Sequence, residues 1–190
     1  MKVRFIFHRG KDSALGKGII AWTWLLALVR CDFKSLKHNF SHVEVWFPDE
    51  NNRFMLIDTS GPEQIGQLRL PLGQCFSSTT RGDAEGVRFA PAAEVLHHSE
   101  RWVYQEFEVD EKDVANLMPA LNDIVGRGYD FAGIFGFFLP WNPQNENKEY
   151  CSEVCSFVAF WLRLMERIFR ISPRRLAKVL GQPITELKGE

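Results

Sequence analysis

The sequence lacks an excess of charge of either sign. It has 23 Lys and Arg residues against 24 Asp and Glu residues, which leaves a formal net charge of -1 at pH 7. Proteins that bind nucleic acid usually carry a basic stripe, because contacts to phosphate dominate their affinity. We therefore expect no nucleic-acid partner for this chain.

Cysteine is scarce and scattered along the chain. The four cysteines stand at positions 31, 75, 151 and 155, and no C-x-x-C pair occurs. Structural zinc sites are usually built from such pairs, and small secreted domains use denser cysteine frameworks. We therefore expect no metal or other cofactor, no disulfide framework and thiols that stay reduced.

Long apolar runs are also missing. The longest run near the N-terminus, GIIAWTWLLALV at residues 18–29, is shorter than the roughly 20 apolar residues that a membrane-spanning helix needs. The opening residues, MKVRFIFHRGKDS, have neither the apolar centre nor the small-residue cleavage site of a signal peptide. We therefore expect a cytoplasmic protein without a transmembrane segment, in which residues 14–30 form a buried helix.

Aromatic residues are abundant. The chain of 190 residues contains 16 Phe and 6 Trp, and 45% of it is hydrophobic, which is enough for a well-filled core in a single domain. Strand-like runs occur at residues 3–7, 42–47, 87–89 and 102–109, and helix-like runs at about 110–126 and 151–170. Residues 75–86 are rich in Ser, Thr and Gly, which indicates a mobile or ligand-facing loop.

The segment Tyr150-Cys151-Ser152-Glu153 separates a polar turn-forming run from a long apolar helix. A cysteine in the first helical turn lies at the positive end of the helix dipole, which favours the thiolate form. This position makes Cys151 a candidate nucleophile. The alternative is a structural thiol, because free cysteine is among the most often buried residues.

A candidate base for that thiol lies far upstream, in the strand-like run 42–47. Alternation along this run places His42, Glu44 and Trp46 on one face and an apolar set, Val43, Val45 and Phe47, on the other. A polar pair beside a tryptophan suggests the wall of a cleft. We predict that His42 and Cys151 meet in space and form a cysteine hydrolase site.

The turn-forming run at residues 48–52 predicts a hairpin between residues 42–47 and 53–59. In that hairpin Asp58 would lie opposite His42 and could orient its ring. Glu44 is the alternative for this role. Because side chains two residues apart on one strand diverge, Glu44 is the better candidate for a substrate contact.

The C-terminal third is predicted to be helical. In the helix over about 151–170 the expected apolar stripe consists of Phe157, Phe160, Trp161, Leu164 and Ile168. Ser172 and Pro173 then indicate the start of a short basic helix, since serine favours the N-cap and proline the first helical position. We expect residues 172–190 to form a helical tail after a domain spanning residues 1–171.

The order of these segments resembles that of the permuted papain-like (NlpC-type) cysteine peptidases and amidases, a group related to the lecithin retinol acyltransferase-like proteins. The motifs S-H-V-E, at residues 41–44, and Y-C-S-E, at residues 150–153, carry the resemblance, which covers about residues 3–165. It implies an α+β fold in which a small antiparallel barrel or sheet packs against the cysteine-bearing helix.

The resemblance also implies roles for individual residues. Cys151 matches the nucleophile and His42 the general base, while Asp58 stands at the third position, where related sequences often have glutamate. Glu44, Tyr150 and Trp46 are the residues that we expect to contact substrate, with the backbone N–H of Cys151 as half of an oxyanion hole.

The implied reaction is the cleavage of an amide bond through an acyl-enzyme, without a metal. The candidate partners are a peptide, a peptidoglycan fragment in a bacterial or phage setting, or a lipid. A lipid acyl hydrolase or acyltransferase, and an inert binding or assembly protein on the same fold, are the alternatives. The sequence leaves the oligomeric state open.

Overall fold

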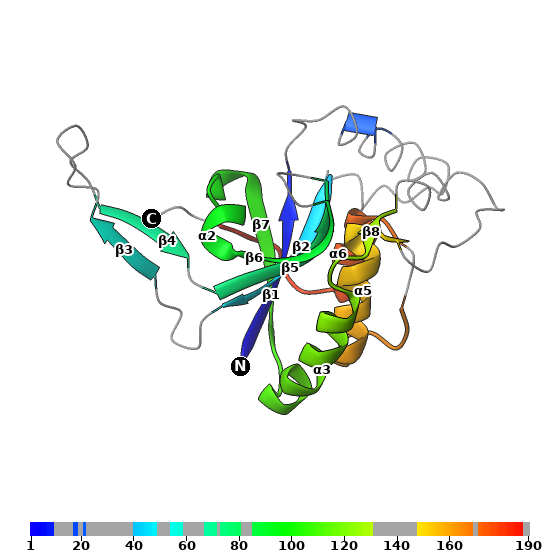
Figure 1. The fold of residues 1–190 in the computed structure, drawn as a ribbon. Helices are drawn as coiled ribbons and strands as arrows, with labels where there is room; N and C mark the ends of the chain where they lie inside the picture. Colours follow the sequence, from blue (N-terminus) through cyan, green and yellow to red (C-terminus); the bar gives the residue numbers. More distant parts are fainter. Residues whose placement is uncertain are drawn as a thin grey trace.

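The computed structural model describes residues 1–9, 17–18, 21, 40–48, 54–58, 67–71, 73–80, 85–130, 148–168 and 171–187. The fold is α+β, with a six-stranded antiparallel open sheet and helices (Figure 1). The strand order is β10-β7-β1-β2-β5-β6. Their bounds are Thr185–Glu186, Trp102–Glu108, Lys2–His8, His42–Pro48, Gly73–Thr79 and Gly86–Pro91, in the same order.

Three helices cover one face of this sheet: α3 (Glu111–Ile124), α5 (Cys151–Trp161) and α6 (Pro173–Leu180) (Figure 1). The short helices α2 (Ala92–Val95) and η2 (Ser99–Arg101) precede β7, and α2 packs against the opposite face. Two pairs of strands lie outside the main sheet. They are β3 (Phe54–Asp58) with β4 (Gln67–Pro71), and β8 (Gly128–Tyr129) with β9 (Lys148–Glu149).

The main strands form where the sequence alternates or is uniformly apolar. The predicted strands at residues 3–7, 42–47, 87–89 and 102–109 are confirmed as β1, β2, β6 and β7. The predicted helix near residues 110–126 is confirmed as α3, and the Asp110 side chain caps it by accepting a hydrogen bond of 2.9 Å from the backbone N–H of Lys112. The predicted helix over residues 14–30 falls almost entirely outside the described residues.

Strand β2 lies in the interior of the sheet, and the predicted hairpin with residues 53–59 is wrong. One edge of β2 pairs with β1, which places His42 opposite His8. The other edge pairs with β5. Because both edges of β2 are occupied, β3 pairs with β4 instead.

The loop predicted over residues 75–86 is wrong for residues 75–79, because residues 73–79 form the interior strand β5. Its hydroxyl-bearing residues are buried, and the hydroxyl of Ser77 donates a hydrogen bond of 2.8 Å to the backbone carbonyl of Val43. A hydroxyl that bonds to a neighbouring strand can be buried at little cost. Serine and threonine are therefore buried in this strand. Their usual preference for loops led to the wrong prediction.

Helix α5 is shorter than predicted and ends at Trp161. Arg163 follows with a left-handed φ of 57°, a conformation that ends helices and is usually taken by glycine. Part of the predicted apolar stripe is therefore wrong: Phe160, Trp161 and Ile168 are 41%, 39% and 45% exposed. The buried residues instead fill the first turns of the helix, where Cys151, Ser152, Glu153, Val154, Cys155, Ser156, Val158 and Ala159 are all covered.

The C-terminal residues join the same core and the same sheet. The predicted start of α6 is confirmed, since the hydroxyl of Ser172 accepts a hydrogen bond of 3.4 Å from the backbone N–H of Arg175. Leu176 and Leu180 of α6 belong to the main hydrophobic core. Strand β10 then pairs with β7 at the sheet edge. The helical tail expected at residues 172–190 thus contributes both a helix and an edge strand.

Candidate active site

Cys151 is the first residue of α5, so it lies at the helix N-terminus, as the sequence predicted. Its side chain belongs to the core cluster between α5 and the sheet and is 3% exposed. The backbone N–H groups of a first helical turn have no acceptor within the helix, and they give this end a partial positive charge. The thiol is therefore placed where a negative charge on sulfur is favoured.

His42 and Glu44 form a direct contact within β2. Nε2 of His42 lies 3.0 Å from Oε1 of Glu44, and both side chains are buried, at 7% and 4% exposure. Same-face residues two apart on a strand are separated by only about 7 Å, so an imidazole and a long carboxylate side chain can bend toward each other. The expectation that these two side chains diverge is wrong.

The imidazole of His42 also lies within electrostatic and hydrogen-bonding range of Cys151. Burial acts to lower the pKa of His42, but the charge and hydrogen bond of Cys151, followed by the hydrogen bond and charge of Glu44, raise this pKa to about 9. The structure thus brings together the two residues that the sequence predicted to meet, and it places the Glu44 carboxylate in contact with the same ring.

The other described thiols have different surroundings. Cys155, one helical turn after Cys151, has an S–H that lies 3.6 Å from the backbone carbonyl of Val43. Burial raises the pKa of Cys155 well above its usual value, and burial has the same effect on Cys75. Both thiols therefore stay neutral near pH 7, and neither is hydrogen-bonded to the imidazole of His42 in the described part of the chain.

Asp58, the residue first expected to orient His42, lies in another sheet. Its backbone partner is Gln67 of β4, whereas the partner of His42 is His8. The position beside the His42 ring is held by Glu44. The orienting role of Asp58 depended on a hairpin between β2 and β3, and these two strands do not pair.

The three expected substrate contacts are buried in the fold. Glu44 is engaged by His42, as described above. Trp46 is 2% exposed, and the guanidinium of Arg4 lies 4.6 Å from its ring centroid. Tyr150 is 1% exposed and stands at the N-cap of α5. These residues therefore do not form the open cleft wall that the sequence suggested.

A second buried histidine lies beside this site, at a strand end where the sequence favoured a solvated residue over a functional one. His8, at the end of β1, is 3% exposed, and its Nδ1 lies 3.3 Å from the hydroxyl of Ser41. A histidine next to Arg9 and Gly10 is usually a solvated loop residue, so only the pairing of β1 with β2 places it next to His42.

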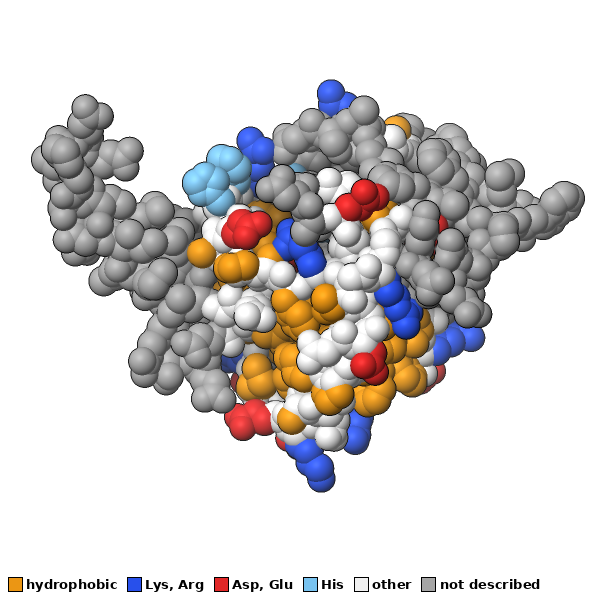
Figure 2. Space-filling view, in the orientation of Figure 1, with side chains coloured by type: hydrophobic (Ala, Val, Ile, Leu, Met, Phe, Trp, Pro, Cys, Tyr) orange, Lys and Arg blue, Asp and Glu red, His pale blue; other side chains and the backbone are white. Residues whose placement is uncertain are grey.

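The remaining described histidines lie on the surface. His97 and His98 follow α2 and are exposed, with ring centroids 4.7 Å apart. Figure 2 shows histidine side chains at the surface in this part of the molecule. Among the described residues, no group of three or more His, Cys, Asp or Glu side chains could hold a metal ion.

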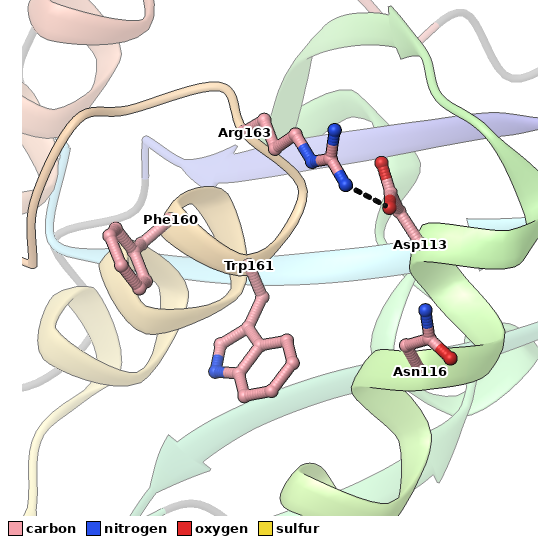
Figure 3. Close-up of a pocket in the computed structure, with 5 residues that line it drawn as sticks. All are labelled: Asp113, Asn116, Phe160, Trp161 and Arg163. Atoms are coloured by element: carbon pink, nitrogen blue, oxygen red, sulfur yellow. Dashed lines mark hydrogen bonds and ion pairs between the residues drawn. The ribbon is translucent and has the colours of Figure 1, made fainter.

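A surface pocket lies at the opposite end of α5 from Cys151. It has a volume of about 290 Å³ and is lined by Asp113, Asn116, Phe160, Trp161 and Arg163. Arg163 reaches from the end of α5 to the Asp113 carboxylate on α3, at 3.2 Å (Figure 3). The pocket contains no thiol or imidazole among its lining residues, so it offers no nucleophile of the kind found at Cys151.

In comparisons with protein-family models, with curated proteins and with solved structures, no match to this chain was found. Within the described residues, none of the helices has the length and apolar character needed to cross a membrane.

Proposed function

We propose that this chain is a cysteine hydrolase of the peptidase or amidase type, with Cys151 as nucleophile, His42 as general base and acid, and Glu44 as the residue that orients the ring. The observation that carries the proposal is the continuous contact from the Cys151 thiol through the His42 ring to the Glu44 carboxylate. A nucleophile, a base and an orienting group in this order are typical of covalent acyl transfer.

The order of the elements supports a permuted papain-like fold. The histidine strand β2 precedes the cysteine helix α5 along the chain, and the helix packs directly on the apolar face of the sheet. In the family that the sequence resembles, the histidine likewise comes before the cysteine. The proposal keeps Cys151 and His42 in the roles that the resemblance implies and moves the third role from Asp58 to Glu44.

The reaction follows from the protonation states of these groups. With a pKa of about 9, His42 holds a proton near pH 7 and can stabilise a Cys151 thiolate. The sulfur attacks the amide carbonyl carbon and forms a C–S bond. When the tetrahedral intermediate collapses, the C–N bond breaks and the imidazolium gives its proton to the leaving amine. Water, deprotonated by the neutral ring, then attacks the thioester carbonyl; the C–S bond breaks, the carboxylic product leaves, and the thiolate–imidazolium pair is restored.

The helix start supplies part of the transition-state stabilisation. The backbone N–H of Cys151 belongs to the first turn of α5, whose N–H groups point toward the N-terminal end of the helix. A developing oxyanion on the attacked carbonyl would lie close to this donor. Glu44 favours the charged imidazolium and keeps its plane in position for the proton transfers.

A thiol-directed activity probe with site-resolved mass spectrometry tests the proposal. We expect Cys151 to be alkylated faster than Cys75 or Cys155 at pH 7, because among these three thiols Cys151 alone lies in range of the His42 imidazole. His42→Ala should reduce the Cys151 rate at least a hundredfold. His98→Ala, a change of the same type at an exposed site, should leave the rate unaltered.

Release of amine groups from peptides and from peptidoglycan fragments then tests the bond that is cleaved. A rate for Cys151 equal to that of Cys155, or one unaffected by His42→Ala, would reject the proposed enzyme and favour an inert binding protein. Release of fatty acid from lipid substrates without any amide cleavage would instead favour the lipid acyl hydrolase alternative.

A further inference from the structure

Three rings lie in one row across adjacent strands next to the proposed catalytic base. The strand register places Trp102 opposite His8 and His8 opposite His42, so the three side chains share a face of the sheet. The Trp102 ring centroid is 4.9 Å from that of His8 and 6.3 Å from that of His42, with edge-on geometry in both cases. All three residues are buried.

His8 is also tied to the residue that precedes His42. Its Nδ1 lies 3.3 Å from the hydroxyl of Ser41, and its backbone carbonyl accepts a hydrogen bond of 3.0 Å from the Ser41 N–H. Ser41 is 6% exposed, so both of these contacts are shielded from water. The backbone that leads into His42 is therefore held by β1 through the side chain as well as the main chain.

The neighbouring row shows that a polar residue is not required at such a position. Ile6, two residues before His8 on β1, lies opposite Glu44 in the register and is fully buried. An aliphatic side chain fills that space without any polar group to satisfy. A buried imidazole costs free energy unless it has a hydrogen-bond partner. At the corresponding place beside His42, His8 has such a partner in the Ser41 hydroxyl.

We infer that His8 is a positioning residue for His42, an inference that rests on the proposed function for its catalytic consequence. Through the Ser41 hydroxyl and the Trp102 ring, His8 limits the rotation of the His42 imidazole and the movement of the strand end that carries it. Glu44 holds one nitrogen of that imidazole, and the His8 contacts keep the ring in the plane that faces Cys151. A small displacement of a reacting group can cost about a hundredfold in rate.

Two variants remove the hydrogen bond between the His8 ring and the Ser41 hydroxyl, and Ser41→Ala also removes the bond of 3.5 Å that this hydroxyl donates to the His8 carbonyl. His8→Phe keeps a ring against Trp102 but cannot bond to Ser41, and Ser41→Ala leaves His8 without that hydroxyl. We expect each to slow Cys151 alkylation about ten- to a hundredfold, with the double variant no slower than the worse single variant. His8→Asn can place an amide near the Ser41 hydroxyl and should recover much of the loss.

A spectroscopic measurement separates positioning from a general loss of structure. The Cε1–H resonance of His42 should shift or broaden in Ser41→Ala and in His8→Phe, while most other resonances stay in place. The control His98→Ala should leave the His42 resonance unchanged. Ser41→Ala also guards against failure of the His8 variants to fold, since it removes only one hydroxyl.

The outcomes distinguish this inference from the proposed function. If wild-type Cys151 reacts no faster than Cys155, the proposed hydrolase fails, yet the His42 resonance in Ser41→Ala still reports whether His8 positions the ring. If wild-type Cys151 is reactive but His8→Phe and Ser41→Ala react at the wild-type rate with an unchanged His42 resonance, the positioning role of His8 is overturned.

Discussion

The two faces of the central sheet bury side chains of opposite character. On the face covered by α3, α5 and α6, β1 and β2 contribute only apolar residues, namely Val3, Phe5, Phe7, Val43, Val45 and Phe47. On the other face the same strands bury Arg4, His8, His42 and Glu44 among apolar neighbours. Equal burial therefore serves packing on one face, whereas on the other face it encloses the imidazole and carboxylate of the proposed site.

The polar face is stable because its charged groups are paired. Arg4 bonds to the Glu106 carboxylate at 2.7 Å, and His42 bonds to Glu44 at 3.0 Å. An unpaired charge at these depths would cost several kcal/mol. The proposed nucleophile comes from the apolar side, and it meets the imidazole at the first residue of β2. The candidate site thus combines a thiol from the helix-covered face with an imidazole from the other face, at the end of β2.

Removing a large side chain from the apolar face should have the largest effect on stability. Phe5 is fully buried, and its ring packs edge-on against Phe107 with centroids 5.6 Å apart. We expect Phe5→Ala to lower the free energy of unfolding by about 3–5 kcal/mol, because it removes apolar contacts and leaves a cavity. Urea-induced unfolding measures this change.

The matched control for that substitution is Val179→Ala on α6, where the side chain is 45% exposed and should contribute within about 0.5 kcal/mol. The folded fraction of Phe5→Ala should still alkylate Cys151 at a rate close to wild type. Loss of reactivity in protein that remains folded would show that the apolar face also shapes the site.

Changing the carboxylate on the polar face should affect reactivity more than stability. Glu44→Gln keeps the shape of the side chain but removes the charge that, with Cys151, raises the pKa of His42. We expect amide turnover to fall about ten- to a hundredfold, and the pKa of His42 to fall from about 9. Steady-state kinetics and NMR titration of the ring measure the two effects.

Asp58→Asn is the control for Glu44→Gln, since it makes the same type of change on a strand that does not pair with β2. It should alter turnover by less than about twofold, because β3 lies in another sheet and does not pair with β2. A larger loss in Asp58→Asn than in Glu44→Gln would return the orienting role to Asp58.

The pH dependence should differ between amide turnover and alkylation of Cys151. Because the pKa of His42 is raised to about 9, the imidazolium persists through neutral pH and is lost as the pH rises above 9. Amide turnover needs this proton for the leaving amine, so it should fall about tenfold per pH unit above that value. Alkylation of Cys151 needs only the thiolate and should not fall.

A turnover profile that begins to decline near pH 6.5, the ordinary range of histidine, would contradict the raised pKa. The same profile measured on Glu44→Gln should move its alkaline limb to lower pH. That movement follows because the removed carboxylate favoured the protonated ring.

Changes at the far end of the polar face should have the smallest effects. The guanidinium of Arg4 lies 4.6 Å from the Trp46 ring centroid and 5.0 Å from that of Tyr104, and it also bonds to Glu106. Arg4→Lys keeps the charge but loses the planar group, so we expect a loss of about 1 kcal/mol in thermal unfolding.

Lys2→Met tests the other partner of the same carboxylate. Lys2 bonds to Glu106 at 2.7 Å, but its side chain is 53% exposed, so the loss of this bond should matter less than Arg4→Lys. Neither variant should change the Cys151 alkylation rate. A change there would show that this end of the polar face is coupled to the site.

Much of the local structure follows from sequence patterns. Strand β2 alternates strongly enough to place His42 and Glu44 on one face, and the polar-to-apolar transition at residue 150 marks the start of α5. Patterns could not predict the end of α5, because Arg163 takes the left-handed conformation without a glycine to indicate it. They also could not predict β5, whose buried hydroxyls resemble those of a loop.

Long-range pairing explains the larger errors. The turn-forming residues 48–52 predicted a local hairpin, yet β2 pairs with β1 and β5, which come from distant parts of the chain. The energy of a local turn is small beside the burial of a strand between two others. The same pairing places His8 next to His42, a neighbour that no local motif could indicate.

The sequence by itself determined the chemical groups and their local settings: a thiol at the first position of a helix, and an imidazole and a carboxylate on the same face of one strand. Only the tertiary structure decided that Glu44 contacts the imidazole, that Asp58 lies in another sheet, and that His8 pairs with His42. The physical reason is that contacts within a few residues depend on backbone periodicity. Contacts between distant segments depend on which strands occupy the two edges of β2.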